Sequence, residues 1–286
     1  MKIKQYKLFF KEQLVSIYDE VEVESFFYII LENKHNLKRI DLALNSDLEF
    51  SQSEIEIWNS IVQQLKLEIP IQYILGTTSF FGLNFEVNAK VLIPRPETEE
   101  LVDWIIKDNL KIESLKKIKI LDIGTGSGCI AVSLAKNILN SDVFAVDISE
   151  NALKIAQNNA IHNEVNVTFI QKNILKTNDL EEIFDIIVSN PPYVRNLEKH
   201  EIHKNVLNNE PHLALFVDDI DALIFYKKIG ELAKINLSKN GTLYFEINQY
   251  LGKKTVHLLK DLGFKNIELK KDIYGNDRMI KITILE

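Results

Sequence analysis

The first 75 residues carry a helical pattern of apolar and polar positions. In two stretches, apolar residues recur every three or four positions, as they do on the buried face of a helix. These residues are Leu8, Phe9, Leu14, Ile17 and Tyr18, followed by Phe26, Phe27, Ile30 and Leu31. A third helix is predicted at 54–67, with Asp47 or the serines of 51–53 as its N-cap and with Ile57, Ile61 and Leu65 on one face. The pattern predicts a small helical domain at residues 1–75.

The pattern changes at residues 76–96, which are rich in glycine, asparagine, aromatic and β-branched residues. Residues 83–87 alternate apolar and polar positions with a period of two, which is typical of a strand. Pro94 and Pro96 end the segment, and the glutamates that follow suit the first turn of a helix beginning near Glu97. We predict a β-hairpin linker over 76–96.

From residue 117 the chain alternates between strands and helices. The first strand is a continuous apolar run, which indicates burial on both faces of a sheet. The predicted strands are 117–123, 142–147, 166–171, 184–190, 241–248, 264–270 and 278–285, and the predicted helices between them are 129–139, 149–163, 221–237 and 255–263. Residues 97–286 therefore form an α/β domain with a seven-stranded, doubly wound, Rossmann-like sheet.

The composition of the chain indicates the kind of environment and the kinds of partner to expect. Hydrophobic residues make up 46% of the chain and charged residues 26%, the usage of a globular protein and not of a disordered one. The single cysteine, Cys129, cannot form an internal disulfide, and no apolar run is long enough to cross a bilayer. With 34 basic and 41 acidic side chains the net charge is -7, which disfavours direct binding to nucleic acid. We expect a cytoplasmic protein with no membrane contact.

A glycine loop, Gly124–Gly128, follows the first strand of the α/β domain. Glycines let the backbone turn tightly and approach a ligand at the start of the next helix. Asp147 ends the second strand, where a carboxylate can accept both hydroxyls of a ribose. A dinucleotide fingerprint would have its third glycine where this chain has Cys129. The pattern therefore favours S-adenosylmethionine over a dinucleotide.

A second motif, Asn190-Pro191-Pro192-Tyr193, follows the fourth strand of that domain. In an open α/β sheet it falls at the same edge as the glycine loop. The prolines remove two backbone donors and leave carbonyls free to accept. The Asn190 side-chain oxygen and the Pro191 carbonyl could accept both N–H groups of an amide or amine, with Tyr193 flat against the planar group. The alternative is a rigid turn with Tyr193 filling the core.

Asn-Pro-Pro-Tyr behind a glycine loop resembles the methyltransferases that modify exocyclic amines and amides with S-adenosylmethionine. Within that group, the segment Ile93–Glu99 (Ile-Pro-Arg-Pro-Glu-Thr-Glu), the leading helical domain and Tyr274–Arg278 (Tyr-Gly-Asn-Asp-Arg) resemble the release-factor glutamine N5-methyltransferases, the HemK/PrmC family. The resemblance covers almost the whole chain. It implies that the acceptor is the glutamine of the Gly-Gly-Gln motif in peptide chain release factors. It also implies S-adenosylhomocysteine as the product. We interpret the helical domain as a docking or lid domain and expect it to contribute contacts, because a folded protein substrate meets an extended surface.

The resemblance assigns roles residue by residue. The cofactor-binding residues it implies are Gly124, Thr125, Gly126, Ser127, Gly128, Asp147, Asn173 and Asn190. Asn173 would flank the adenine, and the next residue, Ile174, replaces an aromatic residue of some relatives. The substrate-binding residues are Asn190, Pro191, Pro192 and Tyr193, of which Asn190, Pro191 and Tyr193 are also the catalytic residues. Residues 95–99 would help to close the site.

Three other functions are open at this stage. They are glutamine methylation of a ribosomal protein, amino-group methylation of nucleic acid, and a cofactor-sensing or scaffold protein without turnover. The acidic charge and the Pro-Arg-Pro-Glu-Thr-Glu segment favour the release-factor branch, and the intact Asn190–Tyr193 motif favours an enzyme. We expect a monomer without a metal site, and interpret the spaced pair His200 and His203 as part of a solvated segment.

Overall fold

The computed structural model describes residues 1–109 and 117–284 and divides the chain into two compact units. The first, the helical unit, comprises Met1–Gly76 together with Lys204–Asn209. The second, the α/β unit, comprises Thr77–His203 and Glu210–Glu286. The observed boundary therefore lies between Gly76 and Thr77.

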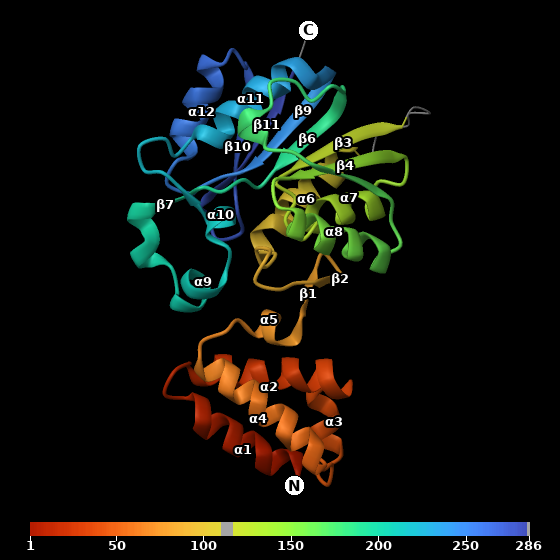
Figure 1. Cartoon of the computed structure of the whole chain (residues 1–286), viewed down its shortest axis with the longest axis vertical. Coiled ribbons are helices and arrows are strands. Elements are labelled where there is room, and N and C mark those ends of the chain that lie inside the picture. The colour runs from red at the N-terminus through yellow and green to blue at the C-terminus, as the bar shows by residue number, and fades with distance from the viewer. Residues whose placement is uncertain (110–116, 285–286) are drawn as a thin grey trace. The chain divides into compact units, whose positions relative to one another are not determined.

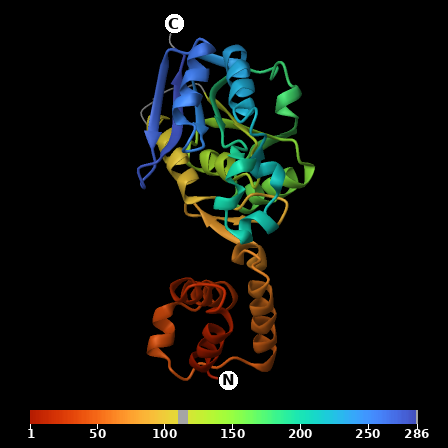
Figure 2. The same ribbon diagram turned by 90° about the vertical axis from the view of Figure 1, so that its left-hand side faces the viewer.

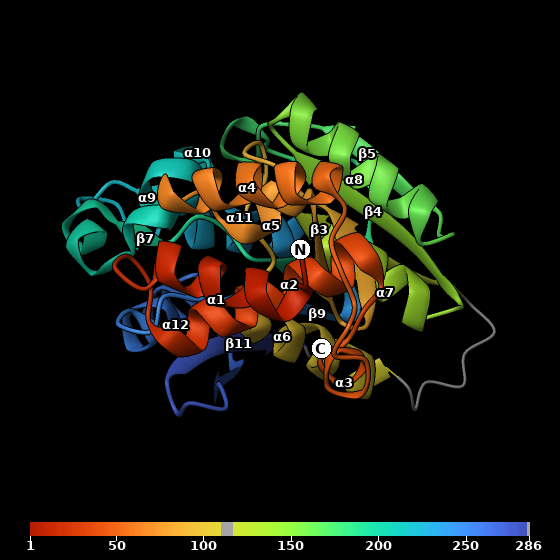
Figure 3. The ribbon, with the colours of Figure 1, turned by 90° about the horizontal axis from the view of Figure 1, so that it is seen from below.

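The helical unit is built from short helices around an aromatic core. Its helices are α1 (Ile3–Leu14), α2 (Glu20–His35), α3 (Arg39–Leu44), α4 (Gln52–Lys66), α5 (Ile71–Leu75) and α9 (Lys204–Asn209). α1 packs against α2 and α4 (Figure 3). Trp58 is fully buried against Phe10 and Phe27, and its indole N–H donates to His35 Nε2 at 2.9 Å. This cluster provides a hydrophobic core for the unit.

The face predicted for α1 was largely wrong, and that predicted for α4 was wrong at one position. α1 buries Tyr6, Phe10 and Leu14, whereas Leu8 and Phe9 are exposed. In α4 the predicted Ile61 and Leu65 are buried, whereas Ile57 is 51% exposed and its neighbour Trp58 is buried. Trp58 turns inward in α4, because its ring buries more apolar area than Ile57 would. In α1 the rings of Tyr6 and Phe10 share the buried face, and that of Phe9 lies on the exposed one. Ile17 and Tyr18 lie beyond the end of α1.

Of the two N-caps predicted for α4, the helix in orange in Figure 2, the structure uses Ser51. The Ser51 hydroxyl accepts from the Glu54 N–H at 3.3 Å, and Glu54 Oε2 accepts from the Ser51 N–H at 2.6 Å. This reciprocal pair is a capping box, which satisfies two backbone donors at the helix start. Asp47 instead pairs with Lys2 at 2.7 Å.

The α/β unit begins with the predicted hairpin, formed by β1 (Thr77–Phe80) and β2 (Leu83–Glu86). Helix α8 (Glu150–His162) covers the outer edge of β2 with asparagine side chains. Asn159 Oδ1 accepts from the Glu86 N–H at 2.6 Å, and Asn159 Nδ2 donates to the Glu86 carbonyl at 3.0 Å. Asn163 Nδ2 donates to the Asn84 carbonyl at 2.9 Å. The hairpin is thus tied to the α/β unit by hydrogen bonds from α8.

The main sheet contains the seven predicted strands, which confirms the predicted fold class. Its strands are β3 (Ile118–Ile123), β4 (Ser141–Asp147), β5 (Val167–Gln171), β6 (Phe184–Ser189), β9 (Leu237–Glu246), β10 (Asn266–Lys271) and β11 (Asp277–Thr283). The order is β10-β11-β9-β6-β3-β4-β5, with β11 antiparallel to both of its neighbours and the other pairs parallel. The last residue of the predicted final strand, Leu285, lies outside the described residues.

Helices cover both faces of this sheet (Figure 1). α6 (Pro96–Asn109), α7 (Cys129–Asn137) and α8 pack on one face, and α11 (Ile224–Asn236) and α12 (Gly252–Asp261) on the other. Adjacent β3 residues show the alternation, because Ile120 belongs to the first core and Leu121 to the second. The remaining elements are η1 (Ile174–Lys176), β7 (Val194–Arg195), η2 (Asn196–Glu201), α10 (His212–Leu215) and β8 (Phe216–Val217). Across residues 1–109 and 117–284, no helix combines the length and apolarity needed to span a membrane.

The chain leaves β3 for β4 on one side and later returns to β6 on the other side of β3. Such a reversal is a topological switch point, and ligands of open α/β sheets bind at the carboxyl ends of the strands beside it. The glycine loop follows β3 and Asn190 follows β6. Both motifs therefore lie at the switch point.

Removing the α4 cap tests its contribution to the helical unit. We expect Ser51→Ala to lower the free energy of unfolding by about 1 kcal/mol, because a backbone donor loses its partner. Urea unfolding in a Trp104→Phe background, where Trp58 is the remaining tryptophan, measures this loss. Ser60→Ala makes the same chemical change at an exposed position inside α4 and serves as the control. Equal effects of the two changes would contradict a capping role.

Candidate active site

The glycine loop needs glycine for its backbone shape. Gly124, Gly126 and Gly128 have φ of 76°, 56° and 81°, in the left-handed region that side chains disfavour. At Gly128, which precedes α7, an added Cβ would lie 3.0 Å from the Ala156 Cβ of α8. At Gly124 and Gly126 an added Cβ would meet nothing within 4 Å. The first two glycines thus give the loop its left-handed turns beside open space, and the third lets α7 and α8 approach.

Asp147, the last residue of β4, is held against this loop. Its Oδ2 accepts from the Gly126 N–H at 2.9 Å, and its Oδ1 accepts from the Ser149 N–H at 2.9 Å. Each carboxylate oxygen has a second lone pair available for a hydroxyl. Ser149 also caps α8 as predicted, since its side chain accepts from the Ala152 N–H. The carboxylate is therefore oriented beside the loop with accepting capacity left.

A cavity of about 350 Å³ lies at this edge of the sheet. It brings together most of the site residues predicted from sequence, namely Gly124, Gly126, Asp147, Asn173, Asn190, Pro191 and Pro192, together with Ile174. Asn173 Oδ1 accepts from the Leu175 N–H at 3.1 Å, and Ile174 is buried. A largely apolar cavity whose lining includes the Asp147 carboxylate suits a nucleoside.

Four predicted residues do not line this cavity: Thr125, Ser127, Gly128 and Tyr193. The Thr125 hydroxyl donates to Asp122 Oδ2 at 2.6 Å, and the Ser127 carbonyl accepts from Asn159 Nδ2 at 2.8 Å. Tyr193 is half-buried, packs against the core under α11 and donates its phenol hydrogen to Glu246 Oε1 at 3.0 Å. The structure thus gives these residues supporting contacts around the cavity.

Other cavity residues carried no motif in the sequence. They include Lys90, Val91 and Leu92 before the Ile93–Glu99 segment, Pro211, Leu213 and Ala214 around α10, and Phe225 and Ile229 of α11. Most are ordinary apolar side chains that reach the cavity only through tertiary packing. No local spacing signal marks them.

A chain of hydrogen bonds leads from Asn190 into the protein. Asn190 Nδ2 donates to Thr98 Oγ1 at 3.2 Å, and the Thr98 hydroxyl donates to Glu246 Oε2 at 2.6 Å. Glu246 ends β9 and is buried. Burial raises the pKa of Glu246, while hydrogen bonds from Thr98 and Tyr193 and the positive charge of Arg278 oppose that rise. Glu246 was not predicted as a site residue, because nothing near it in the sequence marks it as a partner of the motif.

The Ile93–Glu99 segment connects several parts of the α/β unit. Arg95 Nη2 pairs with Glu210 Oε1 at 2.6 Å, and Glu210 Oε2 accepts from the Ile93 N–H at 3.2 Å. Glu99 Oε1 accepts from the Phe81 N–H at 2.8 Å, in the turn of the hairpin. Arg95, Thr98 and Glu99 thus contact three different regions, which gives the segment a structural role beside the cavity.

Comparisons with known proteins agree with this geometry. The family model "Methyltransferase small domain" matches residues 105–215, and "PrmC N-terminal domain" matches residues 9–76. A release factor glutamine methyltransferase of Flavobacterium psychrophilum is 67% identical over 99% of both chains. One from Bacteroides thetaiotaomicron is 41% identical over 95% of this chain and 96% of its own. The chain belongs to the release factor glutamine methyltransferase family.

The family membership predicted from the sequence motifs is therefore confirmed for this methyltransferase. Among solved structures, a methyltransferase from Pyrococcus furiosus aligns with a TM-score of 0.51 at 20% identity, over 83% of this chain and 100% of that chain. A likeness at that level of identity shows the fold alone. The family membership rests on the closer sequence relatives.

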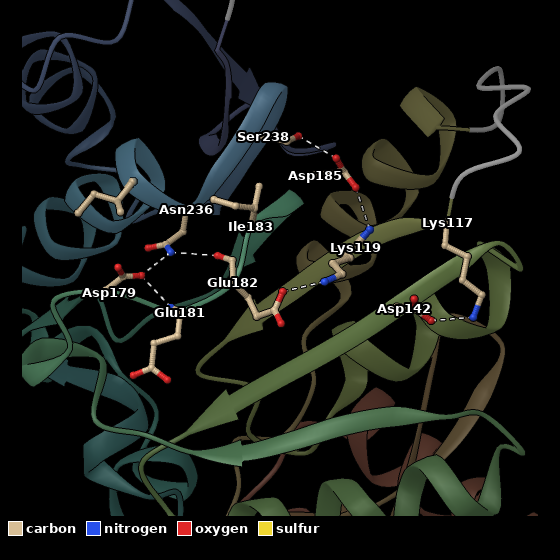
Figure 4. Close-up of a pocket in the computed structure, with 11 residues that line it drawn as sticks. Lys117, Lys119, Asp142, Asp179, Glu181, Glu182, Ile183, Asp185, Asn236 and Ser238 are labelled. Carbon is tan, nitrogen blue, oxygen red and sulfur yellow. Dashed lines mark hydrogen bonds and ion pairs between the residues drawn. The ribbon is translucent and has the colours of Figure 1, made fainter.

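A second, larger pocket of about 680 Å³ lies at the opposite edge of the sheet (Figure 4). Its lysines are paired with carboxylates, Lys119 with Glu182 at 2.7 Å and Lys117 with Asp142 at 2.8 Å. The Asp185 carboxylate accepts from the Ser238 hydroxyl at 2.7 Å. This edge holds the amino ends of β3, β4 and β6, where open α/β sheets do not bind their ligands. The carboxyl-edge cavity is therefore the candidate active site of the methyltransferase.

Below the glycine loop lies a buried acid, Asp122. Burial raises its pKa to about 7, although the hydrogen bond from Thr125 opposes the rise. No hydrogen-bond partner for Asp122 Oδ1 is found in the described part of the chain. The neutral carboxyl is therefore the form that the folded protein favours below neutral pH.

The close approach at Gly128 predicts a specific loss of stability. Gly128→Ala combines left-handed backbone strain with the contact to Ala156, and we expect it to lower the free energy of unfolding by roughly 2 kcal/mol or more. Gly263→Ala is the matched control, because Gly263 has a φ of 96° but an added Cβ there would have open space. Denaturant unfolding should show the smaller loss for the control. Equal losses would mean that helix approach does not require this glycine.

The raised pKa of Asp122 predicts a dependence of stability on pH. A carboxyl whose pKa is about 7 in the folded state and 3.8 when unfolded stabilises the fold below pH 4, and this contribution is lost as pH rises to about 7. The stability of Asp122→Asn relative to the unaltered protein should therefore grow by roughly 2–3 kcal/mol between pH 5 and pH 8. Urea unfolding at both pH values measures it, with the exposed Asp221→Asn as control. A difference independent of pH would contradict the shift.

Proposed function

We propose that this protein transfers a methyl group from S-adenosylmethionine to the side-chain amide nitrogen, N5, of the glutamine in the Gly-Gly-Gln motif of peptide chain release factors. The main support for this proposal is that Asn190–Pro192, the glycine loop and Asp147 all line one cavity. Relatives that match nearly the whole chain are named release factor glutamine methyltransferases, which supports a release-factor glutamine as the acceptor.

The residues of the cavity fit S-adenosylmethionine. Gly124 and Gly126 line the cavity and leave open the space that a Cβ would occupy. The remaining lone pairs of Asp147 would accept the ribose hydroxyls, and Asn173 and Ile174 would flank the adenine. When bound, the cofactor supplies a methyl group on a sulfonium. The protein's part is to hold that group in line with the acceptor nitrogen.

The acceptor amide needs orientation more than proton removal by a charged base. An amide nitrogen is a poor nucleophile, because its lone pair is delocalised into the carbonyl. Asn190 Oδ1 and the Pro191 carbonyl would accept hydrogen bonds from its two N–H groups. These hydrogen bonds would increase the electron density on the nitrogen and orient its lone pair toward the transferred methyl group. This is catalysis by proximity and preorganised dipoles. Tyr193, held by Glu246, would buttress this loop, and contact with the planar acceptor group stays a prediction for its ring.

The helical domain predicted at residues 1–75 is proposed as the part that docks the release factor. A folded protein substrate needs a contact surface much larger than one glutamine side chain, and protein interfaces commonly bury about 800 Å² per partner. The predicted cytoplasmic location, monomeric state and lack of direct nucleic-acid binding stay predictions.

The test is a radiolabelled-methyl assay with purified release factor, beside total RNA and ribosomes, followed by fragment mass analysis. We expect label on the Gly-Gly-Gln glutamine. Asn190→Ala should lower kcat about 100-fold with little change in the Kd of the cofactor, because it removes an acceptor for the substrate. Asp147→Ala should instead raise that Kd about 10–100-fold through the loss of ribose hydrogen bonds.

Asn166→Ala, an exposed change on the amino-terminal side of β5, is the matched control and should alter neither quantity. Label in RNA or in a ribosomal protein would overturn the acceptor while leaving the cofactor site in place. If Asn190→Ala and Asp147→Ala both weakened cofactor binding without affecting turnover, the division of roles would be wrong.

A further inference from the structure

The amide of Asn190 has two chemically different ends, and only one of them suits the proposed role. Its oxygen can accept a hydrogen bond from a substrate amide, whereas its NH₂ group can only donate. If the Asn190 amide were rotated by 180°, its NH₂ group would face the N–H groups of the substrate amide, and the hydrogen bond to the substrate would be lost. Something in the protein must therefore select one orientation.

The hydrogen bonds behind Asn190 have a defined direction. The hydrogen bonds from Thr98 and Tyr193 and the positive charge of Arg278 favour the carboxylate form of Glu246 against its burial. In that form both oxygens accept, Oε2 from the Thr98 hydroxyl at 2.6 Å and Oε1 from the Tyr193 phenol at 3.0 Å. The single hydroxyl hydrogen of Thr98 is thereby committed to Glu246. Thr98 Oγ1 then has only lone pairs for Asn190, and it accepts from Asn190 Nδ2 at 3.2 Å. The NH₂ end of Asn190 is turned inward and its oxygen is the end left for the cavity.

Both supporting residues lie on rigid elements. Thr98 is in the first turn of α6 and 2% exposed, and Glu246 is the last residue of β9 and 1% exposed. The Tyr226 hydroxyl also donates to the Glu246 backbone carbonyl at 3.2 Å. The chain of hydrogen bonds is thus built into packed secondary structure.

We propose that Thr98, held by Glu246, is a positioning residue that fixes the orientation of the Asn190 amide so that its oxygen faces the substrate amide. The inference rests on the proposed role of Asn190 as an acceptor. It gives the threonine of the Pro-Arg-Pro-Glu-Thr-Glu segment a function in turnover without contact to substrate or cofactor.

The test compares Thr98→Val with Thr98→Ser. Valine keeps the size and branching of threonine but has no hydroxyl, whereas serine keeps the hydroxyl and loses a methyl. We expect Thr98→Val to lower kcat about 10–100-fold with the Kd of S-adenosylmethionine unchanged. Thr98→Ser should stay within about 3-fold of the unaltered protein. Thermal unfolding of each variant checks folding, and Thr98→Ala replaces Thr98→Val if valine prevents folding.

A double-mutant cycle separates positioning from packing. In an Asn190→Ala background, single-turnover rates should fall less than about 3-fold further when Thr98→Val is added, because the group it positions is gone. An equal loss in both backgrounds would overturn the inference. So would full kcat in Thr98→Val, or losses in Thr98→Ser as large as those in Thr98→Val.

The same measurements distinguish this inference from the proposed function. If Asn190→Ala lowers kcat but Thr98→Val does not, only the positioning role fails. If Asn190→Ala keeps full turnover on the release factor, the acceptor role of Asn190 and the positioning role fail together, while the substrate assignment stands. If no release factor is labelled, the proposed function itself fails.

Discussion

The parallel pairing of β3 with both β4 and β6 is the constraint on which the rest of the molecule depends. Parallel strands end at the same edge of a sheet, so the segments that follow β3, β4 and β6 emerge side by side. The glycine loop, Asp147 and the Asn190–Tyr193 motif are far apart in sequence, and this pairing alone brings them to one cavity. Helices on both faces bury the strands, which keeps water from competing for the ladder hydrogen bonds.

The fold was largely predictable from sequence because buried parallel strands appear as continuous apolar runs. All seven strands of the main sheet were predicted within a few residues. The helical unit was predicted less well. Its helices carry apolar residues on more than one face, so Leu8 and Ile57 looked like core residues when Tyr6 and Trp58 fill the core. Periodicity locates a helix, but which face turns inward depends on partners that a local pattern does not name.

The cavity was predictable only in part for a related reason. Glycines with positive φ and an acidic strand end have local signatures, so Gly124, Gly126 and Asp147 could be placed in advance. The bond between Thr98 and Glu246 joins residues 148 positions apart, and that between Arg95 and Glu210 joins residues 115 apart. From the sequence alone, many other polar residues could be the hydrogen-bond partner of Thr98 or Arg95. Only the folded backbone decides which of them meet.

Asn159 of α8 and its C-cap residue, Asn163, affect how this protein can associate with other molecules. A two-stranded ribbon has two free edges, and a row of unpaired backbone N–H and C=O groups invites another chain to add a strand. Asn159 and Asn163 are one helical turn apart, and their side-chain amides imitate the peptide groups of a neighbouring strand along β2. Helix α8 thus stands in for a third strand at Glu86 and Asn84. The β2 edge of the hairpin is thereby protected from pairing with a strand of another molecule.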